Sequence, residues 1–212
     1  MRPDKTVMVV CSLFAASCNS VRGSGHPKTE PRTVASFDQV QISGGFTATV
    51  VVGAAPSLTI TADDNLLPII TSTVDHGLLR IRTSRSISTV TPVNIQIATP
   101  MLTSVDVSGG VTITATNVAA PSFEVHASGG CVVTIGGRAP EFRATLSGGV
   151  QLFADGLITE RARVDGSGGV RAAVFATQSI DGSFSGGGML DVGGNPVVRR
   201  VNTSGAAMVS YR

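Results

Sequence analysis

Three side chains of the types used in acid–base catalysis stand out in this sequence: Glu124 and His126, two residues apart, and Asp106, about 20 residues earlier. A carboxylate beside an imidazole can orient the ring, as a general base requires. Asp106 and His126 are separated by one period of the repeat described below, so we expect both in one column of a repeating fold. We expect a polar ladder facing water there, because no nucleophile or second basic group accompanies them. The alternative is a polysaccharide-active site, since some β-helix enzymes cleave acidic polysaccharides with carboxylates, Ca²⁺ and a basic group.

Other motifs with chemical potential have simpler structural interpretations. The oxygens of Asp63, Asp64 and Asn65 could bind Ca²⁺, but a turn or cap role is preferred. The stretch Gly166-Ser167-Gly168-Gly169 is similar to part of a phosphate-binding loop, yet equivalent glycines recur along the chain and no helix is expected to follow. Cys131 falls on an inward position, which favours a packed side chain over a reactive thiol. The sequence therefore predicts no metal or cofactor site.

These residues belong to a chain that repeats with a period of about 20 residues, and a fixed period of this size is typical of solenoid proteins. Apolar and polar residues alternate in phase around each copy, which indicates strands stacked in register. We therefore predict an all-β, right-handed parallel β-helix, with hand assigned by the general rule for parallel connections. The corner of each coil is a Ser-Gly-Gly motif, complete five times and then decayed: Ser108-Gly109-Gly110, Ser128-Gly129-Gly130, Ser147-Gly148-Gly149, Ser167-Gly168-Gly169, Ser185-Gly186-Gly187 and Ser204-Gly205-Ala206.

The corners explain much of the high glycine count of 25 in 212 residues. Glycine permits positive φ at a turn and close approach of neighbouring backbones, and stacked Ser hydroxyls are expected to bond along the column. The column four residues before each Ser predicts attractive neighbours, with Glu124 beside Arg143 and Asp181 between Arg163 and Arg200.

The β-helix domain is expected to span residues 34–212, with regular coils over 108–212 and less regular coils and a cap over 34–107. An earlier Ser-Gly-Gly copy begins at Ser43, several periods before Ser108, and three looser turns would fill that gap. Two segments around the tight turn at 75–77 are expected to pair. No cap is visible at the C-terminal coil, so we predict possible homo-oligomer formation through its open edge.

The N-terminus has the features of an export signal. Basic residues precede a short apolar run and small residues, so 1–17 is predicted to be a signal peptide. Cys18 follows directly and resembles the lipidated Cys of a bacterial lipobox; cleavage at the same bond by signal peptidase I, without lipidation, is the alternative. Residues 18–33 are polar and rich in Gly, Ser and Pro, which predicts a flexible tether. We thus expect a cell-envelope protein, anchored to a membrane by lipid, or otherwise periplasmic or secreted.

The composition limits the classes of binding partner and the disulfide bonds that we expect. The formal net charge of +2, without a basic cluster, disfavours nucleic acid. Of three Cys, only Cys131 lies in the folded part, so an intrachain disulfide is not expected.

Several motifs occur in order along the chain: Phe37-x-x-Val40-x-Ile42-x-Gly44, Ala62-Asp63-Asp64-Asn65-Leu66-Leu67, Gly77-Leu78-Leu79-x-Ile81, Ile95-x-Ile97-x-x-Pro100-x-Leu102 and Val105-x-Val107-Ser108-Gly109-Gly110. In these motifs the chain resembles the bacterial family of putative autotransporter adhesins with a head GIN domain, a domain of unknown function. The resemblance implies an exported β-helix over about residues 34 to 212, often in a lipoprotein, with no catalytic residues to transfer. We therefore expect a non-catalytic, adhesin-like module that binds a glycan, a matrix protein or an envelope protein; a polysaccharide lyase or hydrolase is the alternative.

Overall fold

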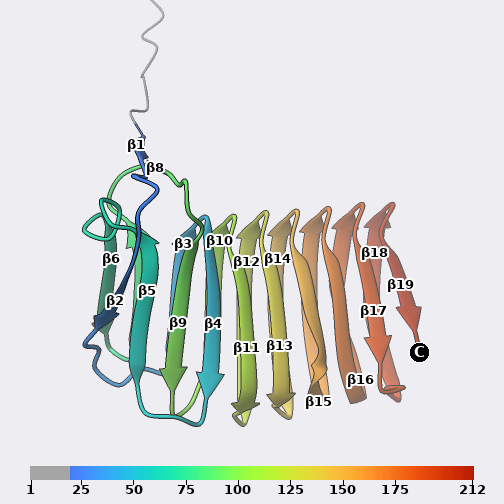
Figure 1. The fold of residues 1–212 in the computed structure, drawn as a ribbon. Coiled ribbons are helices and arrows are strands. Elements are labelled where there is room, and N and C mark those ends of the chain that lie inside the picture. Colours follow the sequence, from blue (N-terminus) through green and yellow to red (C-terminus); the bar gives the residue numbers. More distant parts are fainter. Residues whose placement is uncertain (1–19) are drawn as a thin grey trace, which may run out of the picture.

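A computed structural model describes residues 20–212, which form a β-solenoid of two packed sheets with no helix in that range (Figure 1). The predicted signal peptide and Cys18 lie outside the described residues. Within 20–212, no helix has the length and apolar character needed to cross a membrane. The strands are β1 (Val21–Arg22), β2 (Pro27–Arg32), β3 (Gln39–Gly44), β4 (Phe46–Val52), β5 (Ser57–Asp63), β6 (Ile70–Asp75), β7 (Leu78–Thr83), β8 (Ile87–Ser88), β9 (Val93–Thr99), β10 (Ser104–Gly109), β11 (Thr112–Ala119), β12 (Ser122–Gly129), β13 (Val132–Arg138), β14 (Glu141–Gly148), β15 (Gln151–Gly168), β16 (Arg171–Gly186), β17 (Met189–Gly193), β18 (Val198–Gly205) and β19 (Met208–Tyr211).

Each regular coil contributes one strand to each sheet. Sheet I contains the strands that run into the Ser-Gly-Gly corners, namely β3, β10, β12, β14, the C-terminal parts of β15 and β16, and β18. Sheet II contains the strands that leave the corners, namely β4, β11, β13, the N-terminal parts of β15 and β16, β17 and β19. Neighbouring strands within these stacks are parallel, so the predicted parallel β-solenoid is confirmed.

The core lies between the two sheets and follows the predicted inward columns. Apolar side chains from successive coils stack on one another, as Phe123 and Phe142 do with ring centroids 6.4 Å apart. Both rings are almost fully buried. Because outward positions alternate with these, each strand places every second side chain in the core and the remainder on an outer face.

The corners are held by backbone hydrogen bonds. The first Gly of each corner has positive φ, for example 91° at Gly129. The N–H of Gly130 donates to the carbonyl of Gly109 at 2.8 Å, and Gly149 donates to Gly129 at 2.9 Å. In the described part of the chain no hydrogen bond joins the corner Ser hydroxyls, so the expected Ser ladder is wrong; the glycine backbones approach closely enough to form the ladder themselves.

The predicted charge column has the correct register but forms different contacts. Glu124 is the strand partner of Arg143, and Asp181 that of Arg163, as expected. However, no ion pair joins these neighbours among residues 20–212. Arg163 Nε instead lies 3.0 Å from Asp165 Oδ2 on its own strand. Side chains two residues apart on one strand face share a side of the sheet, so they compete with the partner on the next coil.

The long gap between Ser43 and Ser108 is not filled by three turns. Strands β3 and β10 are direct neighbours, and Ser43 is the register partner of Ser108. The intervening residues leave the stack and extend both sheets at their N-terminal end, where β7 pairs with β3 and β9 pairs with β4 in parallel. Beyond them lie antiparallel strands, with β6 on β7, β5 on β9 and β2 on β5. The β6–β7 hairpin turns at His76 and Gly77, both with positive φ, as its predicted pairing requires.

The predicted flexible tether is wrong from residue 21 onward, because Val21 and Arg22 form β1, which pairs with β8. Residues 27–32 form β2, which lies in the sheet against β5. The Arg32 guanidinium fixes this strand by donating to the carbonyls of Ile70 at 2.7 Å and Leu67 at 2.8 Å. The sequence of this stretch shows no apolar alternation. Its ordered conformation depends instead on backbone pairing with β5 and on the Arg32 side chain.

At the opposite end, β18 and β19 form the last coil of the described chain (Figure 1). No further strand covers their outer edges within residues 20–212. Oligomer formation through this coil stays a prediction.

Candidate binding surface

The three predicted acid–base residues lie on the outer face of sheet I. Asp106 and His126 are register partners on β10 and β12, as the repeat predicts. The imidazole pairs with Glu124 on its own strand, with Nε2 3.3 Å from Oε1. Asp106 is engaged elsewhere, because its Oδ2 accepts a hydrogen bond of 2.8 Å from Gln41 Nε2.

The surroundings of His126 are open and polar. The His126 and Glu124 side chains are 46% and 50% exposed. The adjoining concavity of about 410 Å³ is lined by residues including Thr103, Ser104 and Ser122, so it offers hydroxyl groups and no thiol or amine. Among residues 20–212, no group of three or more His, Cys, Asp or Glu side chains is arranged to hold a metal ion. The arrangement supplies a His–carboxylate pair and a hydrogen-bonding surface.

The Asp63-Asp64-Asn65 segment has structural partners. Asp63 is fully buried, and its Oδ2 accepts hydrogen bonds from the N–H groups of Val90 at 3.1 Å and Thr91 at 3.3 Å. Burial raises the pKa of the Asp63 carboxyl, but the hydrogen bonds to Thr91 and Val90 together outweigh it and leave the pKa below its usual range. The Ser24 hydroxyl donates to Asp64 at 2.5 Å and similarly lowers the pKa of that carboxyl. The segment therefore fastens loops of the cap together, as its preferred interpretation predicts.

Cys131 and the glycine-rich stretch are also structural. Cys131 is fully buried, with its thiol 3.3 Å from the carbonyl oxygen of Ser128. Ser167, Gly168 and Gly169 form an ordinary corner between two strands, with no helix following.

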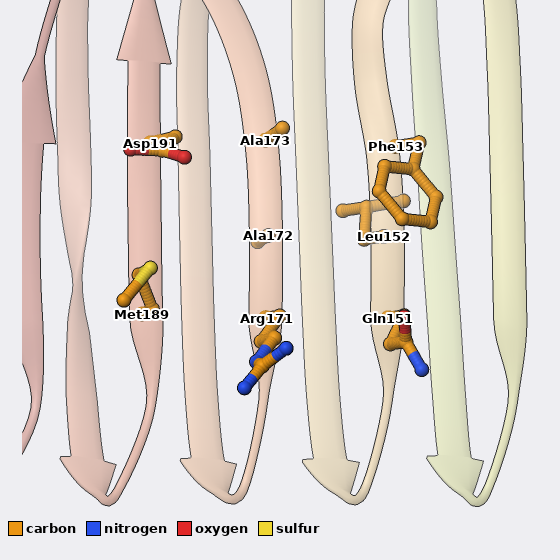
Figure 2. Close-up of a pocket in the computed structure, with 8 residues that line it drawn as sticks. All are labelled: Gln151, Leu152, Phe153, Arg171, Ala172, Ala173, Met189 and Asp191. Atoms are coloured by element: carbon orange, nitrogen blue, oxygen red, sulfur yellow. The ribbon is translucent and has the colours of Figure 1, made fainter.

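A different feature, on the outer face of sheet II, is the apolar notch shown in Figure 2. Phe153, Ala173 and Asp191 occupy one column on β15, β16 and β17, while Gln151, Arg171 and Met189 occupy the column two residues earlier. The notch measures about 170 Å³. Phe153 is 44% exposed and Met189 is 39% exposed, so two large apolar side chains of the notch face water.

The notch is formed because a small side chain lies between larger ones in one column of the sheet. Thr134, Phe153, Ala173 and Asp191 follow one another on successive coils. The methyl group of Ala173 leaves space between the larger Phe153 and Asp191 side chains (Figure 2). Sequence reasoning missed this site, although the signal was present: Phe153 falls on an outward position where the neighbouring coils carry Thr134 and Ala173.

Comparison with known proteins supports the fold and identifies the family. A family model described as "Putative auto-transporter adhesin, head GIN domain" matches residues 36–196. The structure is similar to that of a putative adhesin from Bacteroides fragilis, with a TM-score of 0.73 and 18% identity over 91% of this chain and 100% of that chain. It is also similar to a putative lipid binding protein from Parabacteroides distasonis and a putative adhesin from Parabacteroides merdae, both with TM-scores of 0.57, at 17% and 16% identity over 91% of this chain and 99% of theirs. No protein of curated function matches the chain in sequence.

Proposed function

The chain belongs to the family described as putative auto-transporter adhesin, head GIN domain, and on that premise we propose that it is an exported, membrane-anchored binding module of the cell envelope that acts without catalysis. The outer face of sheet II is its binding surface. The observation that carries this proposal is the exposed notch around Phe153 and Met189. Exposed apolar clusters rimmed by polar groups are typical of interaction sites.

The fold suits a binding role because the platform is rigid. Phe153 and Arg171 stand on strands that pair on both sides, and the strands carry a continuous buried core beneath them. A side chain held on such strands loses little backbone freedom when a ligand binds, so the entropic cost of association is reduced.

Export and anchoring rest on the sequence of residues 1–18. The signal features precede Cys18, whose lipid would anchor the mature chain. Since β1 and β2 are docked on the cap, the free connection after Cys18 is short. The anchored module would therefore sit with its cap end close to the membrane, instead of at the end of a long tether.

A polysaccharide-active enzyme is the second candidate, and the contact between His126 and Glu124 favours it. Binding is preferred because the imidazole is open to solvent and, within residues 20–212, forms no hydrogen bond with the Ser and Thr hydroxyl groups of the adjoining concavity. The two candidates differ in whether a bound glycan is cleaved.

The proposal is tested on full-length protein that has been exported in a bacterial host and purified from the membrane fraction. The protein is applied to arrays of glycans and matrix proteins, and each bound glycan is then analysed for cleavage. Saturable binding without turnover supports the module. Cleavage that is lost in His126→Ala would establish the enzyme instead, and a protein that binds neither array would refute the adhesin-like role.

Anchoring is tested separately with Cys18→Ser. We expect the wild-type protein to incorporate labelled lipid and to fractionate with membranes, and the variant to do neither. A variant that remains in the membrane fraction would contradict the lipid anchor at Cys18.

A further inference from the structure

We propose that the notch on sheet II binds a saccharide, with the Phe153 ring as its stacking platform. This inference rests on the proposed binding function and names the ligand class of that surface. It depends on three features of the notch: the exposed ring, the space over Ala173 and the polar groups at its rim.

The ring is presented to solvent. Phe153 is 44% exposed, and Figure 2 shows its ring broadside above the outer face of the sheet. The other aromatic side chain with comparable exposure among the described residues, Tyr211, is covered by the guanidinium of Arg199, 4.4 Å from its ring centre. Phe153 therefore supplies an open aromatic face, which suits the apolar C–H face of a sugar ring.

The space beside the ring fits one sugar unit. Phe153 and Asp191 lie in one column with Ala173 between them, so their strands are about 10 Å apart. Ala173 contributes only a methyl group to that interval, and Met189 adds an apolar side to the notch (Figure 2). The volume of about 170 Å³ is of the size of a single sugar ring.

The rim carries hydrogen-bonding groups that the protein leaves free. Within residues 20–212, neither the Gln151 amide nor the Arg171 guanidinium has a side-chain hydrogen bond or ion pair. Asp191 is oriented by the Ser210 hydroxyl and by Arg212 Nη2 at 3.4 Å, and its carboxylate retains further acceptor capacity. Donors and acceptors thus surround an apolar platform, as recognition of a polyhydroxylated ring requires.

The charges of the rim leave one cation without a partner. Arg171 and Asp191 are the charged residues that line the notch, and Arg212 pairs with Asp191 from outside the lining. Within residues 20–212 the Arg171 guanidinium has no such partner, so it is free to donate hydrogen bonds to the hydroxyl or carboxylate groups of a sugar. A protein side chain could cover Phe153, but it would leave the free amide and guanidinium groups unpaired, which is unfavourable when they are buried.

The test uses a printed array of neutral and acidic oligosaccharides, followed by titration of the oligosaccharide that binds best into the membrane-extracted protein. We expect Phe153→Ala to weaken binding by about tenfold or more and Phe153→Trp to retain it, because stacking depends on an aromatic face. Ile158→Ala is the matched control, since Ile158 is 50% exposed but does not line the notch. Circular dichroism melting verifies that each variant is folded.

The outcomes separate this inference from the proposed function. If the protein binds only matrix proteins, or if it binds glycans equally well after Phe153→Ala, the saccharide notch is refuted while the binding module stands. If Phe153→Ala abolishes binding to a protein and to no sugar, the notch is a protein contact and the inference is likewise overturned. A protein that binds nothing on either array refutes the proposed function itself.

Discussion

The ring of Phe184 occupies the space that Gly166 leaves open on the neighbouring strand of the core. The two residues are register partners on β15 and β16. A Cβ atom placed on Gly166 would lie only 2.7 Å from Phe184 Cε1. Phe184 is 1% exposed, so the ring has no solvent into which it could move. The pair is a large-to-small match that fixes the packing of two successive coils.

Gly166→Ala should therefore destabilise the protein, by about 1 to 3 kcal/mol, because overpacking forces a buried ring from its place. Chemical denaturation measures the loss. Phe184→Leu in the same chain should relieve part of the clash, so that the double variant loses less than the two single variants added together. Strictly additive losses would show that the two residues do not interact.

The two glycines of one corner differ in how strictly the fold requires glycine at each position. They therefore provide a matched pair of sites for substitution. Gly129 has φ of 91°, and a Cβ on it would lie 2.7 Å from the carbonyl oxygen of Gly109. At Gly130 the nearest such contact is 3.8 Å, an ordinary van der Waals distance. The first glycine is thus needed for both conformation and close approach, whereas the second is needed for neither.

We accordingly expect Gly129→Ala to cost about 1 to 3 kcal/mol in unfolding free energy, and Gly130→Ala less than about 0.5 kcal/mol. Parallel urea titrations of the two variants provide the comparison. Equal losses at both positions would mean that the corner does not depend on the positive φ of its first glycine.

The solenoid was predictable from the repeat, because every copy of the repeat indicates the same alignment between neighbouring strands. Ser108, Ser128 and Ser147 are aligned by sequence, and the structure pairs them in that order. The N-terminal end was less predictable, since Ser43 pairs with Ser108 across an excursion that follows no period. Antiparallel pairing in that excursion depends on contacts distant in sequence, which alternation alone does not specify.

The candidate site was also only partly predictable from the sequence. Placing Asp106 beside His126 needed only the period, and this was correct. The actual partner of His126 depends on side-chain rotamers, which lead the imidazole to Glu124 and Asp106 to Gln41. The notch at Phe153 required comparison of side-chain volumes between coils, because its floor is defined by the small size of Ala173.

Acid should weaken the cap through Asp63. Its pKa is lowered in the folded protein, so its contribution to stability is present above the ordinary carboxyl pKa and is lost as the pH falls toward the folded value. We expect the midpoint temperature of thermal unfolding to decrease when the pH is lowered below about 4. In Asp63→Asn the midpoint should be lower at neutral pH and should fall less on acidification, because no proton is then taken up at this position.

Asp155→Asn is the control for that measurement. Asp155 is exposed within β15, at the register shift between the two parts of that strand, and its carboxylate makes no hydrogen bond or ion pair within residues 20–212. Its variant should follow the wild-type pH profile. If Asp63→Asn follows that profile as well, the buried carboxylate does not contribute to the acid sensitivity.

Arg32 determines whether the segment before the solenoid is docked or free. Its side chain is 15% exposed, and the guanidinium donates to the carbonyls of Leu67 and Ile70 while Nε pairs with Glu30 at 2.9 Å. These bonds join β2 to the chain that leads into β6. Backbone pairing with β5 alone leaves β2 on the outer edge of the cap, where strands open readily.

Arg32→Ala should therefore release β2 from the cap, with a loss of about 2 to 3 kcal/mol, since hydrogen bonds from a charged donor to partly buried carbonyls are among the stronger ones. Hydrogen exchange followed by mass spectrometry should show faster exchange in residues 27–32 and 57–63, with the regular coils unchanged. Lys28→Ala is the control, because Lys28 is exposed on the same strand and forms no such bonds in the described chain. Unaltered exchange of β2 in Arg32→Ala would show that the backbone ladder alone holds the segment.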